Sequence, residues 1–260
     1  MRKLIQVSAV ALAVLALSSC NNSGNNNSEG KKIDRTHVKS ERAGLNEVVV
    51  HINGDMDKLN PLTYTSADAG YAIGRLFMQL EDVDPDSFNL FPQLVVARPE
   101  MKLIDEGEYK GGLSLTFEIR SEATWDNGTP VTADDVAFSV KALKNPQVDA
   151  EPQRPYMEFL DEVVIDKTNP RKFTYLCKGR YMLSEVSAGL FAIMPEYVYD
   201  PDKIMRKFSV KDLNNPKTIA KLKSNPDIIR FAKQFNSEKY AREKGIVNGC
   251  GPYELDQWIT

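Results

Sequence analysis

The sequence predicts an α/β fold in which helices pack around a mixed sheet. Three observations carry this prediction. Residues 113–120 alternate apolar and polar side chains, which is typical of a half-buried strand. Residues 132–143 repeat apolar side chains at helical spacing, after a threonine suited to capping a helix. Residues 163–166 and 173–177 flank a Lys-Thr-Asn-Pro turn and read as a hairpin.

The start of the chain has the features of an export signal. A positive start precedes an apolar run over residues 4–17, which is too short to span a bilayer of roughly 30 Å. Leu17-Ser18-Ser19-Cys20 then matches the bacterial lipobox, in which the cysteine is acylated. We expect residues 1–19 to be a lipoprotein signal peptide and Cys20 to carry acyl chains such as palmitate, which anchor a protein stably to a membrane. An ordinary secretory signal with an incidental cysteine is the alternative.

A polar segment follows the cysteine. Residues 21–28 contain only Asn, Ser and Gly, and charged and polar residues continue to position 42. Such a segment has no apolar surface to bury, so we expect residues 20–44 to be a lipidated, disordered tether. The globular region is then predicted over residues 45–260.

Composition excludes several classes of function. The formal net charge is −3 and no basic stripe is visible, which argues against nucleic acid as a partner. The two histidines and the cysteines lack metal-ligand spacing, and no nucleophile lies near a base, so we expect no metal, no cofactor and no enzymatic activity. Whether Cys177 and Cys250 form a disulfide is left open, because sequence separation says nothing about geometry.

The first half of the globular region predicts these elements in order. Residues 47–53 are rich in Val and Ile and read as a buried strand. Ser66 is placed to cap a helix whose apolar face begins at Ala69 and ends at Leu80. The acidic stretch 81–86 reads as a solvated turn, because it lacks the spacing and the glycine of a calcium-binding loop.

The turn and helix after the alternating strand form a predicted corner. Residues 125–130 are dense in turn formers. Thr132 and Asp135 then have the spacing of a capping box, and we expect Trp125 to pack against this corner as a core residue. Short helices are predicted after Pro195, over 219–222 and over 237–244, and a further strand is predicted to begin at residues 251–255.

The stretch 117–139 resembles a known family. It contains Phe-Glu-Ile-Arg, a tryptophan, and Asp-Asn-Gly-Thr-Pro-Val-Thr-Ala-Asp-Asp-Val-Ala-Phe-Ser. This is similar to the extracellular solute-binding protein family 5, the peptide- and nickel-binding components of ABC importers. Leu-Asn-Pro at 59–61, Met-Pro-Glu-Tyr-Val-Tyr at 194–199 and Gly-Cys-Gly-Pro-Tyr at 249–253 resemble further family motifs in the same order.

The resemblance implies a fold and a candidate site. It implies a periplasmic-binding-protein-like fold of type II, with two lobes that close on a peptide or similar solute. Matched to the family, Thr65, Ser66 and Ala67 stand where oligopeptide-binding members line the cleft, and Tyr156 matches a tyrosine at the cleft. A free main-chain edge at 65–67 would suit an extended peptide. Ser66 acting only as a helix cap, and Tyr156 acting only in packing, are the alternatives.

The resemblance also implies a role and its limits. Family members run to about twice this length, so we expect the chain to cover the first lobe and to lack the second. The implied function is that of a lipid-anchored binding component on the periplasmic side of the cell envelope, which delivers solute to an ABC importer permease. A truncated or non-transport lipoprotein interaction module is the alternative. One lobe by itself is expected to bind solute weakly, since closure of two lobes supplies much of the affinity.

Overall fold

The computed structural model describes residues 46–259, which belong to two compact units, 1–50 and 51–260. In the first unit, the described residues 46–50 form no helix or strand. Val48, Val49 and Val50 are all exposed. The strand predicted over 47–53 is therefore wrong for this structure. A strand requires a neighbour to accept its hydrogen bonds, and no pairing of this segment occurs among the described residues. The predicted signal peptide, the acylated Cys20 and the tether lie outside the described residues.

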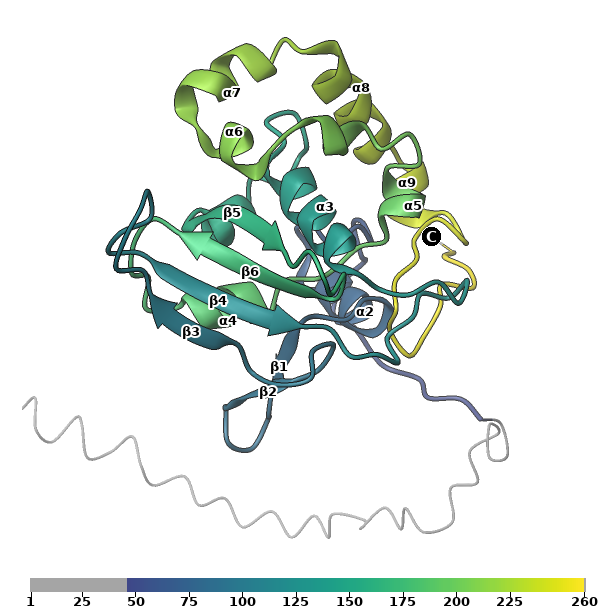
Figure 1. The fold of residues 1–260 in the computed structure, drawn as a ribbon. Coiled ribbons are helices and arrows are strands. Elements are labelled where there is room, and N and C mark those ends of the chain that lie inside the picture. The colour runs from purple at the N-terminus through teal and green to yellow at the C-terminus, as the bar shows by residue number, and fades with distance from the viewer. Residues whose placement is uncertain (1–45, 260) are drawn as a thin grey trace, which may run out of the picture. The chain divides into compact units, whose positions relative to one another are not determined.

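The second unit contains both helices and strands (Figure 1). In chain order, its elements are α2 (Ala67–Leu76), β1 (Glu81–Val83), β2 (Leu90–Pro92), β3 (Glu100–Leu103), β4 (Leu113–Glu118), α3 (Ala133–Lys144), η3 (Arg154–Met157), β5 (Leu160–Ile165), β6 (Lys172–Cys177), α4 (Ser184–Gly189), α5 (Glu196–Tyr199), η4 (Ile204–Lys207), α6 (Val210–Asn214), α7 (Pro216–Leu222), α8 (Pro226–Phe235) and α9 (Lys239–Arg242). The α/β prediction is confirmed.

The main sheet has the strand order β3-β4-β6-β5, and neighbouring strands run antiparallel. The alternation in 113–120 and the hairpin of β5 and β6 are as the sequence predicts. Leu115, Phe117 and Tyr175 point to one buried face, where the rings of Phe117 and Phe173 stack with centroids 5.6 Å apart. Helix α3 lies over the β5 end of the sheet (Figure 1).

The predicted corner forms around the carboxylate of Asp135. Its Oδ2 accepts a 2.9 Å hydrogen bond from the Thr132 N–H, which is the carboxylate half of the capping box. The same oxygen accepts from the Trp125 indole N–H at 3.3 Å, and Trp125 is only 3% exposed. Gly128 adopts a φ of 79° in the turn, a value that suits glycine. Trp125 is thus a core residue, as expected.

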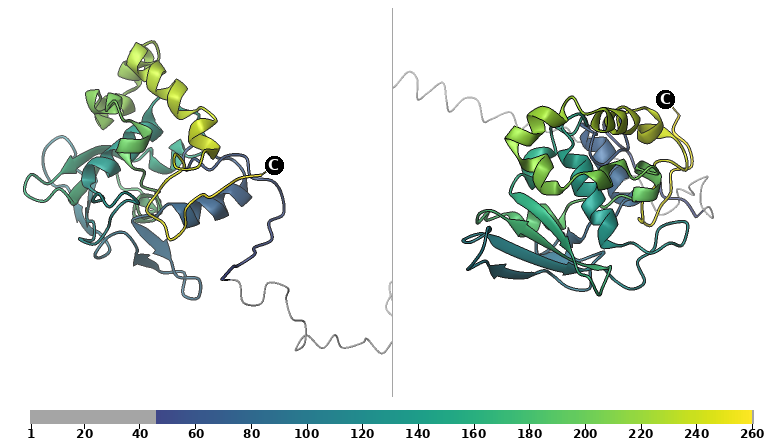
Figure 2. Two further views of the ribbon diagram at one scale, coloured as in Figure 1. Left: turned by 90° about the vertical axis from the view of Figure 1, so that its right-hand side faces the viewer. Right: turned by 45° about the horizontal axis from the view of Figure 1, so that its top comes forward.

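The 194–199 and 249–253 motifs are held in place by hydrogen bonds from their backbone N–H groups. Oδ1 of Asp135 accepts from the Glu196 N–H at 3.1 Å, which ties the 194–199 motif to the corner. The 249–253 motif runs beside the end of α2 (Figure 2), where the Gly251 N–H donates to the Leu76 carbonyl at 2.9 Å. A Cβ on Gly249 would lie 2.2 Å from that same carbonyl oxygen, so the close approach requires glycine.

Two further sequence expectations need correction. Residues 251–255 form no strand, since their backbone hydrogen bonds go to the end of a helix. The acidic stretch 81–86 is a solvated turn only in its second half, because Glu81–Val83 is strand β1 and the Glu81 side chain is fully buried. Helix α8 was not predicted, although Asn225 caps it and Pro226 opens it in the usual manner.

The remaining expectations concern cysteines and membranes. Cys177 and Cys250 are both free thiols in this structure, so the open question of a disulfide is answered in the negative here. Burial raises the pKa of Cys177 to about 12 and that of Cys250 to about 11, which keeps both thiols protonated. Within residues 46–259, no helix is both long enough and apolar enough to cross a membrane.

Candidate functional site

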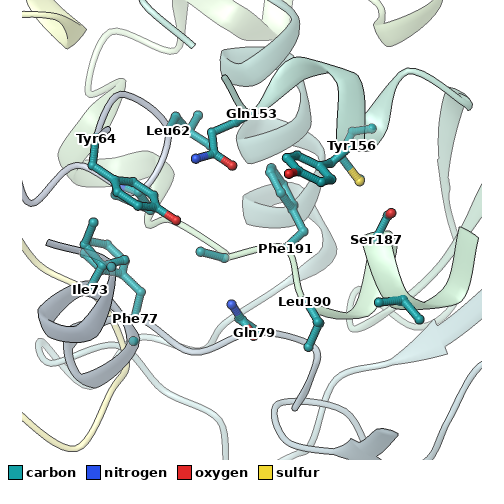
Figure 3. Close-up of a pocket in the computed structure, with 16 residues that line it drawn as sticks. Leu62, Tyr64, Ile73, Phe77, Gln79, Gln153, Tyr156, Ser187, Leu190 and Phe191 are labelled. Carbon is teal, nitrogen blue, oxygen red and sulfur yellow. The ribbon is translucent and has the colours of Figure 1, made fainter. Parts of the chain in front are cut away.

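A pocket of about 310 Å³ opens beside α2 (Figure 3). Its walls come from three stretches of the chain that lie far apart in sequence: residues 61–79 on and around α2, residues 153–157 in η3, and residues 186–192 in α4 and the segment after it. An antiparallel bridge between Gln79 and Ala192 joins the first stretch to the third. The pocket is therefore a product of tertiary packing.

The polar side chains of the pocket have no hydrogen-bond partner among the described residues. Tyr64, Gln79, Gln153, Tyr156 and Ser187 line it, and Figure 3 shows them distributed around the opening. Among the residues that the structure describes, no hydrogen bond engages the side-chain oxygen or nitrogen of any of the five. Amide and hydroxyl groups can both donate and accept hydrogen bonds. This set can therefore pair with the N–H donors and with the C=O acceptors of a peptide-like ligand.

Apolar side chains form the floor between these groups. Leu62, Ile73 and Phe77 are buried and reach the pocket from the α2 side, and Phe191 reaches it from the segment after α4. An apolar floor with a few polar groups is the usual composition of a small-molecule site. Tyr156 stands at the rim with 61% of its surface exposed.

The structure separates the four residues predicted to contact ligand. Tyr156 lines the pocket, whereas Thr65, Ser66 and Ala67 do not. The Thr65 N–H and hydroxyl both donate to Oδ2 of Asp57, at 2.7 and 2.8 Å, and the Ser66 N–H donates to Oδ1 at 3.2 Å. These two N–H groups are consequently unavailable to a ligand while Asp57 holds them. Their role as ligand contacts stays a prediction.

Asp57 is the residue that sequence reasoning missed at this edge. Partial burial opposes ionisation of its carboxyl group, but the hydrogen bonds from Thr65 and Ser66 outweigh that effect and lower its pKa below the ordinary value. Ser66 also caps α2, because its hydroxyl accepts from the Ala69 N–H at 3.4 Å. The 65–67 segment is thereby held in one conformation at the start of α2.

Helix α4, which supplies one wall, rests on a buried carboxylate. Glu81 is fully buried, and its two oxygens accept no hydrogen bond among the described residues. A Cβ on Gly189 of α4 would lie 2.3 Å from one of those oxygens, so the helix backbone packs directly on the carboxylate. The Arg98 Nε lies 4.0 Å from Glu81 and 2.7 Å from the Glu185 carboxylate of α4. One guanidinium thus lies within 4.0 Å of two carboxylates.

Burial is the main influence on Glu81, and repulsion from Glu185 adds to it. Together they raise the pKa of Glu81 to about 7, against the opposing attraction of Arg98. The carboxyl group does not reach the pocket itself. It lies beneath the helix that carries Val186, Ser187 and Leu190 into the pocket wall.

A second hollow, of about 440 Å³, lies between α3, η3, α6 and α7, but the cations of Lys144 and Arg154 that line it already have partners. The Lys144 ammonium donates to the Met157 carbonyl at 2.9 Å and to Asn214 Oδ1 at 2.8 Å. The Arg154 guanidinium donates to carbonyl oxygens of the 143–148 segment. No set of three or more His, Cys, Asp or Glu side chains in residues 46–259 is arranged to hold a metal ion. The α2 pocket is thus the better candidate site.

The polar pocket residues other than Tyr156 gave no signal in the sequence. Gln79, Gln153 and Ser187 lie in no motif, and their common feature is the space they surround. The arrangement can hold a small, neutral, partly apolar group, but the described residues contain no nucleophile and base placed to act on it.

Comparisons with known proteins identify the family and the fold of this chain. The model of the bacterial extracellular solute-binding proteins, family 5, matches residues 99–260. The peptidoglycan-binding protein YepA of Agrobacterium fabrum is 32% identical over 92 residues, which cover 34% of this chain and 14% of that protein. The periplasmic oligopeptide-binding protein OppA of Salmonella typhimurium is 30% identical over 90 residues, covering 31% of this chain and 16% of that protein.

The fold has close counterparts among solved structures. The murein tripeptide binding protein MppA of Escherichia coli superimposes with a TM-score of 0.56 at 15% identity, over 80% of this chain and 35% of that one. The match spans about a third of that protein's length. The fold is that of the type II periplasmic binding proteins. On the family match over most of the globular region, the chain belongs to the bacterial extracellular solute-binding proteins of family 5.

Proposed function

We propose that this protein is the lipid-anchored binding component of an ABC importer, which captures a peptide or similar small solute in the α2 pocket and delivers it to a membrane permease. The observation that carries the proposal is the set of unengaged polar side chains around an apolar floor. Membership of family 5 and the peptide- and peptidoglycan-binding names of its relatives support it. In this proposal the globular region works on the periplasmic side of the cell envelope.

The expected mode of binding follows from the pocket. An extended peptide backbone offers alternating donors and acceptors, which Gln79, Gln153 and Ser187 can meet, while one side chain enters the apolar floor. The rim at Tyr156 is exposed, so the described residues contact a ligand from one side. Several contacts worth about 1 kcal/mol each then correspond to a dissociation constant on the order of 0.1–1 mM for this chain.

Tyr156→Ala tests whether this pocket is the binding site. We expect it to raise the dissociation constant for a mixed tripeptide pool about five- to tenfold, because one aromatic contact is worth about 1 kcal/mol. Ligand-observed NMR detects binding in this weak range. The free energy of unfolding should change by less than about 0.5 kcal/mol, since the ring is largely exposed.

Tyr71→Ala is the matched control for that experiment. Tyr71 is 70% exposed on helix α2, which forms one wall of the pocket, but it does not line the pocket, so peptide binding should be unaffected. Equal loss of binding in both variants, or none in either, would place the ligand elsewhere. Absence of any peptide binding in the parent protein would favour the alternative of an interaction module that does not bind solute.

Cys20→Ala tests the lipid anchor. Without the thiol no acyl chain can be attached, and each buried methylene of such a chain contributes about 0.8 kcal/mol to membrane binding. We expect the variant to accumulate as a soluble or unprocessed species after cell fractionation. Cys250→Ala removes a cysteine from the globular region and should leave the protein in the membrane fraction. A Cys20→Ala protein that is cleaved and sediments like the parent would contradict the lipoprotein assignment.

A further inference from the structure

The α2 pocket has a feature that bears on which solutes it accepts: its lining carries no formal charge. None of its sixteen residues is Asp, Glu, Lys, Arg or His. The ligand-facing polar groups are the amides of Gln79 and Gln153 and the hydroxyls of Tyr64, Tyr156 and Ser187. In a chain with 27% charged residues, a lining of this size without one is informative about the ligand.

Two carboxylates on the α4 side of the pocket do not line it. Glu81 is sealed beneath α4 and does not line the pocket. Glu185 is on the same helix, but its carboxylate accepts two hydrogen bonds from the Arg98 guanidinium, at 2.7 and 2.8 Å. Arg98 thus balances part of the negative charge, and it does not line the pocket either.

From this arrangement we infer that the pocket selects an uncharged ligand group with an apolar or aromatic body, and rejects side chains that carry a net charge. The inference rests on the proposed function and specifies its substrate class. A charged group entering the pocket would lose hydration next to Phe77, Leu190 and Phe191 and would find no counter-ion. Burial of an aromatic group against these side chains is favourable, and the edge of the ring could still contact an amide.

The test compares four free tripeptides, Ala-X-Ala with X as Phe, Gln, Lys or Glu, on the full chain. Their termini are identical, so only the central side chain differs. We expect the dissociation constants of the Lys and Glu peptides to exceed that of the Phe peptide by at least about tenfold, since burial of an unpaired charge is strongly unfavourable. Ligand-observed NMR titration gives all four values under one set of conditions.

Gln153→Glu should change the preference of the pocket between the Lys and Glu peptides. The substitution keeps the shape of a side chain that has no partner among residues 46–259 and adds one negative charge to the lining. It should improve binding of the Lys peptide at least about tenfold relative to the Glu peptide, as expected for a new charge pair of low exposure. Gln257→Glu makes the same charge change at an exposed position outside the pocket and should leave the ratio unaltered.

The outcomes separate the two proposals. If all four peptides bind within a factor of about three of one another, the specificity inference is overturned while peptide binding stands. A Lys-to-Glu ratio that shifts equally in the two Gln→Glu variants would also overturn it, because net charge rather than the pocket would be responsible. If no peptide binds at all, the proposed function itself fails.

Discussion

Replacing Trp125 by Ala should lower the free energy of unfolding by about 3–5 kcal/mol, because it removes a buried indole from the corner between β4 and α3. The indole is 3% exposed, and its N–H donates to Asp135 at 3.3 Å. Its loss therefore leaves a cavity and deprives a buried carboxylate of one donor. Urea unfolding followed by far-ultraviolet circular dichroism measures the change without relying on tryptophan fluorescence.

The other tryptophan provides a matched control. Trp258 is only partly buried and has the Arg242 guanidinium 4.6 Å from its ring centroid. Trp258→Ala should cost no more than about 1 kcal/mol, as expected for a partly exposed cation–π contact. A Trp125 variant no less stable than the Trp258 variant would mean that the indole is not a core residue, and would make it a ligand-contact candidate.

Glu81→Gln should stabilise the protein at alkaline pH by about 2–3 kcal/mol and have little effect near pH 4. The pKa of Glu81 is raised to about 7 in the fold from an ordinary value of 4.5, chiefly by burial. The folded state therefore holds the Glu81 proton more tightly than the unfolded state does. Its contribution to stability is fully present below the ordinary pKa and is lost as pH rises from about 4.5 to about 7.

The measurement is the difference in free energy of unfolding between parent and Glu81→Gln at pH 4.5, 6 and 8. Taking the difference between the two proteins cancels the contributions of the carboxylates that they share. Glu106→Gln, at an exposed position, should change stability by less than about 0.5 kcal/mol at each pH. A Glu81→Gln effect that does not grow between pH 4.5 and 8 would show that this carboxyl group is hydrated in the folded protein.

The sequence alone was sufficient to predict the elements that depend on residues close together in the chain. The alternating strand, the Gly128 turn and the Thr132 cap each depend on residues within a few positions of one another, and all form as predicted. Burial of Trp125 could also be predicted, because its neighbours fix the corner that it fills. Two of the family motifs belong to this framework, because Asp135 in the 117–139 stretch accepts a hydrogen bond from the Glu196 N–H of the 194–199 motif.

Strand predictions failed where pairing was needed from elsewhere. Residues 47–53 and 251–255 have suitable side chains, but β-propensity cannot supply the neighbouring strand that a β-structure requires. The prediction for Glu81 was wrong in the opposite way, because a residue expected in a solvated turn is buried in a strand. An acidic run is normally solvated, yet this carboxylate is buried because α4 and Arg98 converge on it from positions more than 15 residues away in the sequence.

The pocket itself was decided by tertiary structure. The sequence identified Tyr156 by resemblance, and it marked 65–67 as a possible main-chain edge. Only the fold brings η3 and α4 against α2, so that Gln79, Gln153 and Ser187 surround one space. Only the fold places Asp57 on the N–H groups of residues 65 and 66. Local sequence determines which backbone segments form helices and turns, whereas a binding site depends on distances between segments, and these are set by packing of the whole unit.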